Sequence, residues 1–294
     1  MLDLKPKSYL RYIHSCILKS LTTAGITVFS LFICNNLSAQ GNLLITPRRV
    51  VFEGSRRSID LNLANIGQDT ATYAISIVQL RMKDDGGFEN ITEPDPGQQF
   101  ADRFIRYFPR TVTLGPRESQ VVKVQLIRSN ELTDGEYRSH IYFRAVPKMV
   151  PLGEQEKARD TTTISVRLVP VFGITIPVIV RKGESTASVS LSDLKFELVN
   201  GSEPVISFSF HRTGNMSVYG DILIEHISLQ GAVTSVGIAN GVAVYTPNTM
   251  RQFRLNLNKD TGADFKTGTL RVIYSAPSDV KPMRYAEAEL ALSL

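Results

Sequence analysis

The chain has 294 residues; 43% of them are hydrophobic, 33 are Lys or Arg and 28 are Asp or Glu, which gives a formal net charge of +5 at pH 7. This length and apolar content are sufficient for two domains with separate hydrophobic cores. Both cysteines, Cys16 and Cys34, lie in residues 1–40, so the rest of the sequence excludes disulfides, thiol nucleophiles and thiolate metal sites.

Residues 1–40 have the composition of an export signal. A basic leader precedes an apolar stretch at residues 21–34, and small residues follow near a plausible cleavage site at Gln40. The apolar stretch is shorter than the ~20 residues of a membrane-spanning helix. We therefore expect residues 1–40 to be removed on export and no membrane span to remain. A lipid anchor at Cys34 is the alternative, but the preceding residue, Ile33, is not small.

The export signal also carries most of the excess positive charge. It holds four of the 33 basic residues and one of the 28 acidic residues, so the net charge of residues 41–294 falls to +2. The overall basicity of the chain therefore gives no support for a nucleic-acid partner.

The first half of the remaining chain has the two-residue period of β-strands. Alternating runs separated by turn signals predict strands over residues 59–65, 72–82, 121–127 and 138–146. Residues 99–107 fit several periods, and we expect a loop or a single turn there. Short strands at this spacing are typical of an antiparallel sandwich.

Residues 161–180 form the most informative β-rich run of the chain. Ile164, Val166 and Leu168 alternate with polar residues, which places three branched apolar side chains on one face of an extended segment. The preceding loop, residues 148–160, is rich in charge, Pro and Gly. Most strands of this kind pack into their own core, but one at the edge of a domain can offer its backbone and apolar row to another polypeptide.

The second half of the chain predicts another set of strands, over residues 187–191, 195–199, 205–211, 220–227, 242–246, 252–258, 269–275 and 286–294. The predicted fold is therefore all-β, with two immunoglobulin-like β-sandwich domains joined at an angle with a cleft between them. The domains are predicted at residues 41–180 and 184–294. Grooves between domains are common binding sites.

The sequence contains no recognisable catalytic or metal-binding pattern. Three histidines, His140, His211 and His226, lie far apart and lack the close spacing of metal sites. Residues 84–87 (DDGG) lack the ligand sequence of a calcium loop and fit a hairpin turn. We expect neither an enzyme nor a bound cofactor or metal.

Three stretches resemble motifs of the periplasmic pilus-assembly chaperones of the chaperone/usher pathway. Residues 49–54 (RVVFEG) resemble the first-strand motif of that family, and residues 113–124 resemble its Leu-x-Pro-Gly turn and following strand, with Gly and Pro exchanged. Residues 134–147 (DGEYRSHIYFRAVP) resemble its most distinctive stretch. The stretches occur in the family's order within residues 43–177, so the chain resembles a divergent member. The second half matches only in being a predicted β-sandwich.

The resemblance implies a periplasmic chaperone that lends an edge strand to pilus or other surface-structure subunits, for their folding and delivery to an assembly site. Ile164, Val166 and Leu168 would then fill the groove of the subunit. Burying three such side chains contributes roughly 5–9 kcal/mol before ordering costs.

The family also anchors the terminal carboxylate of the subunit with two basic residues. Arg49 matches the first position and could donate two parallel hydrogen bonds to a carboxylate. Taken alone, an arginine on a strand is more often solvated or ion-paired. The second position falls within residues 170–174, which contain no cation, so Arg167 or Arg181 would have to replace it.

Several functions remain open at this point. The resemblance does not decide whether an outer-membrane usher accepts the complex, or whether the free protein self-associates through its edge strand. An Ig-like adhesin or carbohydrate-binding module of the cell surface or periplasm is the main alternative, and an enzyme of unfamiliar type is a third. A charge at Val166 would discriminate, because only strand lending depends on that side chain.

Overall fold

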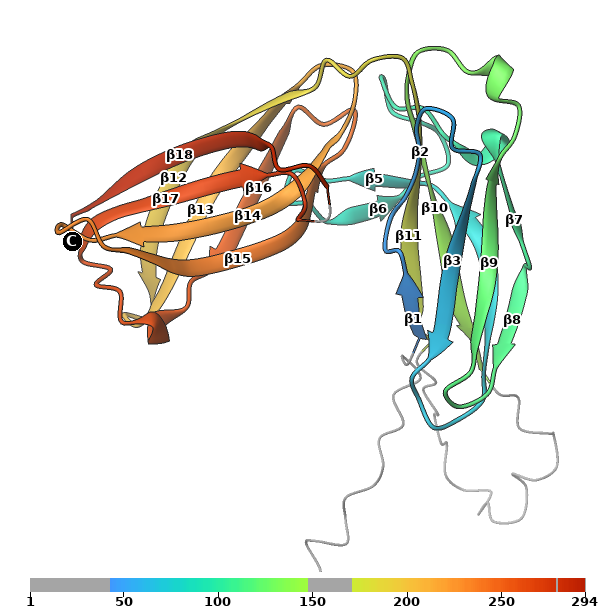
Figure 1. Cartoon of the computed structure of the whole chain (residues 1–294), viewed down its shortest axis with the longest axis horizontal. Helices are drawn as coiled ribbons and strands as arrows, with labels where there is room; N and C mark the ends of the chain where they lie inside the picture. The colour runs from blue at the N-terminus through green and yellow to red at the C-terminus, as the bar shows by residue number, and fades with distance from the viewer. Residues whose placement is uncertain (1–42, 148–170, 279, 294) are drawn as a thin grey trace, which may run out of the picture. The chain divides into compact units, whose positions relative to one another are not determined.

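The computed structural model describes residues 43–147, 171–278 and 280–293 (Figure 1). The predicted export signal lies outside the described residues, and so do Ile164, Val166, Arg167 and Leu168. In the described ranges, no helix is long and apolar enough to cross a membrane.

The N-terminal strands form a sandwich of two sheets and a short hairpin. They are β1 (Leu43–Thr46), β2 (Val50–Phe52), β3 (Ser58–Asn65), β4 (Ala71–Val78), β5 (Leu80–Met82), β6 (Phe88–Asn90), β7 (Ile105–Phe108), β8 (Thr111–Leu114), β9 (Ser119–Leu126), β10 (Gly135–Val146) and β11 (Gly173–Lys182). One sheet has the order β1-β3-β9-β7 and the other β2-β11-β10-β4-β8, while β5 pairs with β6. With β1, β3, β4, β7, β9, β10 and β11 as strands A to G, these are the two sheets of an immunoglobulin sandwich.

Period-two alternation explains how these strands pack. Leu61 and Leu63 of β3 and Val122 and Val124 of β9 are fully buried in the N-terminal core, whereas the residues between them point to solvent. Tyr137, near the start of β10, places its hydroxyl 3.1 Å from the backbone N–H of Thr133, which donates to it. This return contact is the tyrosine corner of immunoglobulin-like domains.

The C-terminal strands form a second sandwich. They are β12 (Ser188–Val199), β13 (Glu203–Thr213), β14 (Val218–Ile227), β15 (Val233–Val244), β16 (Met250–Asn256), β17 (Thr267–Ser275) and β18 (Arg284–Ser293). The sheet β12-β13-β16 faces the sheet β15-β14-β17-β18 across a separate core that includes Phe210 and Tyr274. These orders match strands A-B-E and C′-C-F-G, so the prediction of two immunoglobulin-like sandwiches is confirmed.

Some element boundaries differ from the sequence-based prediction. Residues 187–191 and 195–199 belong to one strand, β12, whose pairing shifts between Ser192 and Lys195. β15 begins well before the predicted 242–246. That earlier part was not predicted, because its irregular pairing with β14 breaks the period-two pattern. Within residues 99–107 a 3-10 turn (Asp102–Phe104) is followed by strand β7, so the predicted loop or turn is only partly correct.

The hairpin predicted at residues 84–87 is confirmed. It joins β5 to β6, with the backbone N–H of Gly87 donating to Asp85 Oδ1 at 2.7 Å. Gly86 has a φ of +83°, a conformation that glycine adopts without the steric cost of a Cβ atom.

Candidate functional site

Among the described strands, none pairs with the first half of β11 along one of its two edges. Along one side it pairs with β10 from Gly173 to Lys182. On the other side it pairs with β2, in parallel, only at Val178, Ile179 and Val180. Residues 173–177 therefore expose one row of backbone N–H and C=O groups that no described strand pairs, and such an edge is a template for another chain.

Every second side chain of β11 faces the N-terminal core. Ile176, Val178 and Val180 belong to the N-terminal core, and Ile174 packs against it. Before the strand, Val171 and Phe172 are 44% and 45% exposed. The chain thus enters β11 through apolar side chains that are half in solvent.

Arg49, just before β2, has an unusual environment. Its guanidinium carbon lies 4.4 Å from the centroid of the Tyr219 ring, in the C-terminal sandwich. Its Nε and Nη2 atoms are buried and find no hydrogen-bond acceptor in the described part of the chain. Elsewhere, Arg81 uses this same pair of atoms to grip Asp95, at 2.7 Å and 2.5 Å. Arg49 therefore has the pair of donors that binds a carboxylate in Arg81, without an acceptor among the described residues.

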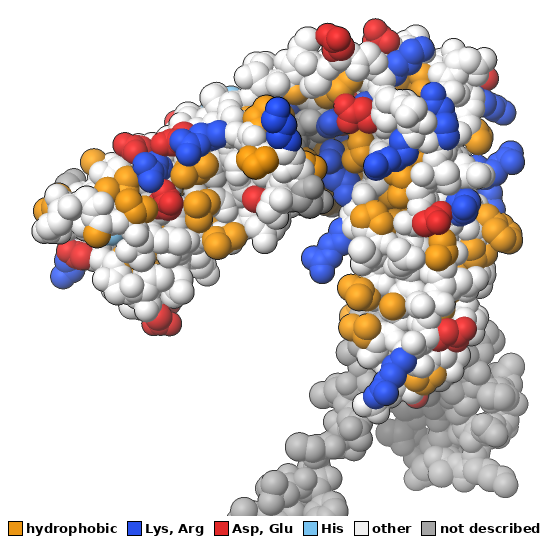
Figure 2. Space-filling view, viewed as in Figure 1, with side chains coloured by type: hydrophobic (Ala, Val, Ile, Leu, Met, Phe, Trp, Pro, Cys, Tyr) orange, Lys and Arg blue, Asp and Glu red, His pale blue; other side chains and the backbone are white. Residues whose placement is uncertain are grey.

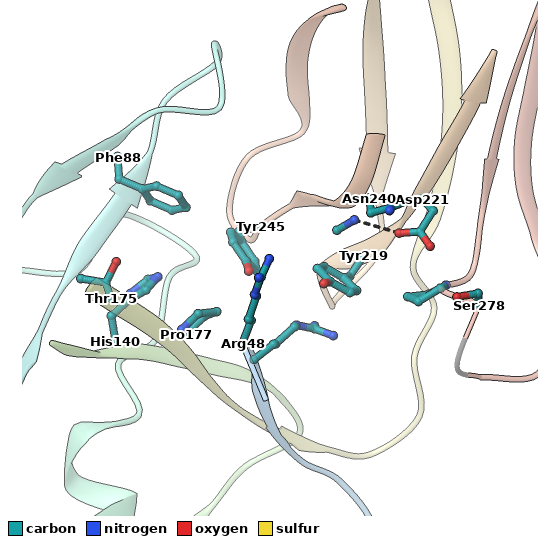
Figure 3. Close-up of a pocket in the computed structure, with 13 residues that line it drawn as sticks. Arg48, Phe88, His140, Thr175, Pro177, Tyr219, Asp221, Asn240, Tyr245 and Ser278 are labelled. Carbon is teal, nitrogen blue, oxygen red and sulfur yellow. Dashed lines mark hydrogen bonds between the residues drawn. The ribbon is translucent and has the colours of Figure 1, made fainter. Parts of the chain in front are cut away.

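A pocket of about 500 Å³ joins these features. Arg49, Thr175 and Pro177 line it, together with Tyr219 and Tyr245 of the C-terminal sandwich. Figure 3 shows Tyr245 and Arg48 between Phe88, His140 and Thr175 on one side and Tyr219 and Asp221 on the other. Arg49 and two residues of the first half of β11, Thr175 and Pro177, thus line one pocket.

A second pocket, of about 780 Å³, shares Arg48, Arg49 and Tyr219 with the first. Its lining also includes Arg56, Arg181 and Arg284 and, among the described residues, no carboxylate. Figure 2 shows several Lys and Arg side chains close together on the upper part of the N-terminal sandwich, with fewer acidic ones among them. Arg181 and Arg284 are paired with Glu136 and Glu287, so the excess positive charge of the described lining comes from Arg48, Arg49 and Arg56, and it favours an anionic ligand.

Arg181, one of the two alternatives for a second anchor, is already engaged. Its Nε donates to Glu136 Oε2 at 2.9 Å and its Nη2 donates to the carbonyl of Ser217 at 2.7 Å. The other alternative, Arg167, lies outside the described residues.

The structure reveals two buried polar side chains that the sequence did not single out for the site. Arg138 and His140 on β10 are each 2% exposed. Their alternation with Ser139 and Ile141 does not indicate that they are buried. Phe88 of the β5–β6 hairpin packs on the His140 ring at a centroid distance of 5.6 Å, and Tyr245 covers Arg138. The only sign in the sequence was that Arg138 and His140 lie two residues apart, on the same face of one strand.

Burial, with a smaller contribution from the charge of Arg138, lowers the pKa of His140 from 6.5 to about 3. On acidification the unfolded chain therefore binds this proton first, and stability is lost as the pH falls from 6.5 towards 3. At pH 4.5 we expect His140 to lower the free energy of unfolding by roughly 2–3 kcal/mol relative to pH 7. Urea unfolding of the wild type and of His140→Gln at both pH values measures this. The variant should lose less stability on acidification, and equal losses would show that His140 does not titrate in this range.

Comparisons with known proteins give distant structural matches. No family model matches the chain, and no curated protein does. Among solved structures the chain is similar to the YadV chaperone, with 14% identity and a TM-score of 0.42, over 85% of this chain and 100% of that one.

Two further matches have the same character. One is the CupB2 chaperone of Pseudomonas aeruginosa, with 14% identity and a TM-score of 0.39, over 85% of this chain and 100% of that one. The other is the class 5 fimbriae chaperone CfaA, with 13% identity and a TM-score of 0.38, over 86% and 100%. All three are named chaperones, the class that the sequence motifs resemble. Likenesses this distant leave the function to be argued from the chain's own residues.

Proposed function

We propose that the chain is a periplasmic chaperone that binds and caps pilus or other surface-structure subunits by lending them an edge strand. One observation carries the proposal: Arg49 lines the same pocket as Thr175 and Pro177, which lie on the part of β11 that no described strand pairs along one edge. A strand that paired along β11 and ended in this pocket would have both its backbone and its terminal carboxylate bound.

The backbone part of this interaction is strand addition. A subunit that lacks one strand exposes unpaired backbone groups and an apolar groove, which is an aggregation hazard. Pairing along β11 would satisfy those groups, and alternate side chains would fill the groove. Ile164, Val166 and Leu168 have the same parity as Ile174 and Ile176, so an uninterrupted extended segment would place all five on one side.

The carboxylate part falls to Arg49. Its Nε and Nη2 groups are buried next to Tyr219 and have no acceptor among the described residues, and an unmet buried donor is unfavourable. A carboxylate would satisfy both donors at once with charge-assisted hydrogen bonds. The bound state is therefore favoured by the groups that the free state leaves unpaired.

Replacing Arg49 with glutamine should weaken the capture of an envelope subunit. Loss of a charge-assisted, two-point contact costs about 1.5–3 kcal/mol, which is roughly 10- to 100-fold in affinity. The measurement is the amount of smaller β-rich protein that co-elutes with the tagged mature chain from periplasmic extract, identified by mass spectrometry. Arg106→Gln is the matched control, because Arg106 lies on β7, exposed and away from both arginine-lined pockets.

The outcomes separate the candidate functions. Co-elution that falls for Arg49→Gln and not for Arg106→Gln supports the chaperone. Binding of glycans or matrix ligands by the wild type, with no co-eluting subunit and no response to Arg49→Gln, would replace it with an adhesin or carbohydrate-binding module. Delivery of a captured subunit to an outer-membrane usher is the further step that we propose for the loaded form.

A further inference from the structure

Exposed arginines gather at one end of the sheet β1-β3-β9-β7, in which β3, β9 and β7 lie side by side (Figure 1). Backbone hydrogen bonds bring three segments together there. The N–H of Leu126, the last residue of β9, donates to the carbonyl of Arg57 at 2.9 Å, and the N–H of Ile127 donates to the carbonyl of Phe104 at 2.7 Å. The exposed arginines of these segments form a basic cluster of Arg57, Arg103, Arg106 and Arg128.

The positive charge of the basic cluster is not neutralised by an ion pair. Within residues 43–147, 171–278 and 280–293, the ion pairs include none of its four arginines. In the C-terminal sandwich, by contrast, Arg254, Arg271 and Arg284 each lie against a glutamate. Asp102 and Glu131 are the carboxylates nearest to the cluster along the chain, and they too are absent from these pairs. The cluster is therefore free to bind an anion from outside the chain.

Apolar side chains adjoin the basic cluster. Phe108 is 75% exposed and Val121 is 43% exposed, and both line a hollow of about 420 Å³ together with Arg106 and Lys123. Arg106 and Phe108 point to the same side of β7, because strand residues two apart share a face. Exposed aromatic and apolar side chains next to cations are typical of proteins that bind at the boundary between lipid and water.

The residue types favour a phospholipid surface over other anions. All four cations of the cluster are arginines, and a planar guanidinium can donate two parallel hydrogen bonds to a phosphate. They are spread over three neighbouring segments, an arrangement that suits an array of headgroups. A polyanion in solution would bind the cations but would give Phe108 no apolar surroundings, whereas the acyl boundary of a bilayer gives it both.

We propose that this outer face of β3, β9 and β7 docks the mature chain on an anionic phospholipid bilayer. The basic cluster binds headgroup phosphates, and Phe108 inserts at the lipid–water boundary. This activity goes beyond subunit capture, since neither of the two pockets that contain Arg49 is lined by a residue of the cluster or by Phe108. For a chaperone of exported subunits, docking would concentrate the protein at the membrane that those subunits cross.

Co-sedimentation with vesicles tests the docking. The purified mature chain is mixed with vesicles of phosphatidylcholine alone or of phosphatidylcholine with phosphatidylglycerol, and the bound fraction is measured after centrifugation. We expect binding to be at least tenfold tighter when phosphatidylglycerol is present, and to weaken as the salt concentration rises.

Three variants assign the binding to this face. Each arginine should contribute roughly fivefold, so Arg103→Gln combined with Arg106→Gln should weaken binding roughly 25-fold. Phe108→Ser should weaken it roughly tenfold, because the ring no longer leaves water. Arg144→Gln is the matched control, since Arg144 is exposed on β10, in the other sheet of the sandwich. Circular dichroism checks that each variant keeps its fold.

Each outcome decides the proposal. Equal binding to both kinds of vesicle, or binding to neither, overturns it. An equal loss in Arg144→Gln would show a general effect of charge and would also overturn it. Binding that Phe108→Ser leaves unchanged and that dextran sulfate releases would assign the cluster to a polyanion in solution. Subunit capture is scored separately: Arg106→Gln should retain it while losing vesicle binding, and Arg49→Gln should show the reverse.

Discussion

Replacing Glu136 with alanine should lower the free energy of unfolding by about 3–5 kcal/mol, the cost of breaking a buried ion pair by removing one partner. The Glu136 side chain is fully buried, and its carboxylate accepts hydrogen bonds from Arg181 Nε at 2.9 Å, the backbone N–H of Ser217 at 3.0 Å, the Ser217 hydroxyl and the Thr246 hydroxyl at 3.3 Å. Ser217 and Thr246 belong to the C-terminal half of the chain. Removing the carboxylate would leave these donors, and the Arg181 charge, without their acceptor.

A matched control lies within the C-terminal sandwich. Arg271 donates to Glu225 through Nε and Nη2, at 3.0 Å and 2.6 Å, but the Glu225 side chain is 18% exposed and both residues lie in one sheet. Glu225→Ala should therefore cost only about 1 kcal/mol. Urea unfolding followed by circular dichroism measures both variants. Equal losses would show that the Glu136 network contributes no more than a surface pair.

The alternation of apolar residues was sufficient to predict the fold class and most of the long strands. Leu61 and Leu63, and Val122 and Val124, face a core on one side and solvent on the other, and a local pattern of that kind is visible in the sequence. β1 and β2 are too short to show a period. β15 contains Gly237 and Gly241 and pairs irregularly, so only its last residues fell within a predicted strand, 242–246.

Only those residues of the candidate site that belong to a local sequence motif could be predicted. Arg49 was found because it is the first residue of the first-strand motif, residues 49–54. Its neighbour Tyr219, and the stacking of Arg138 on Tyr245, depend on contacts between residues more than a hundred positions apart. The burial of His140 also depends on residues distant in the sequence. Phe88 of the β5–β6 hairpin covers the face of β10 for which the alternation predicts exposure to solvent.

The second large effect is expected in the segment that we propose to be lent: Val166→Asp should abolish subunit capture, with a loss of at least 100-fold in affinity. If Val166 fills an apolar groove, the substitution places an unpaired carboxylate where a branched apolar side chain was buried, and an unpaired charge in an apolar site is strongly unfavourable. The expected loss also includes the ~1.5–3 kcal/mol of apolar burial that Val166 itself provides. The measurement is co-elution of the subunit with the tagged chain, with circular dichroism to confirm that the fold is unchanged.

Ser165→Asp provides the control that makes this result specific. It introduces the same charge one residue away, but an extended strand places residue 165 on the opposite face from residues 164, 166 and 168. Strand lending therefore predicts capture by Ser165→Asp and none by Val166→Asp. Loss of capture in both variants would indicate a general electrostatic effect of the segment, and retention in both would show that the apolar row does not enter the subunit. Only capture by Ser165→Asp together with its loss in Val166→Asp requires a strand whose two faces have different surroundings in the complex.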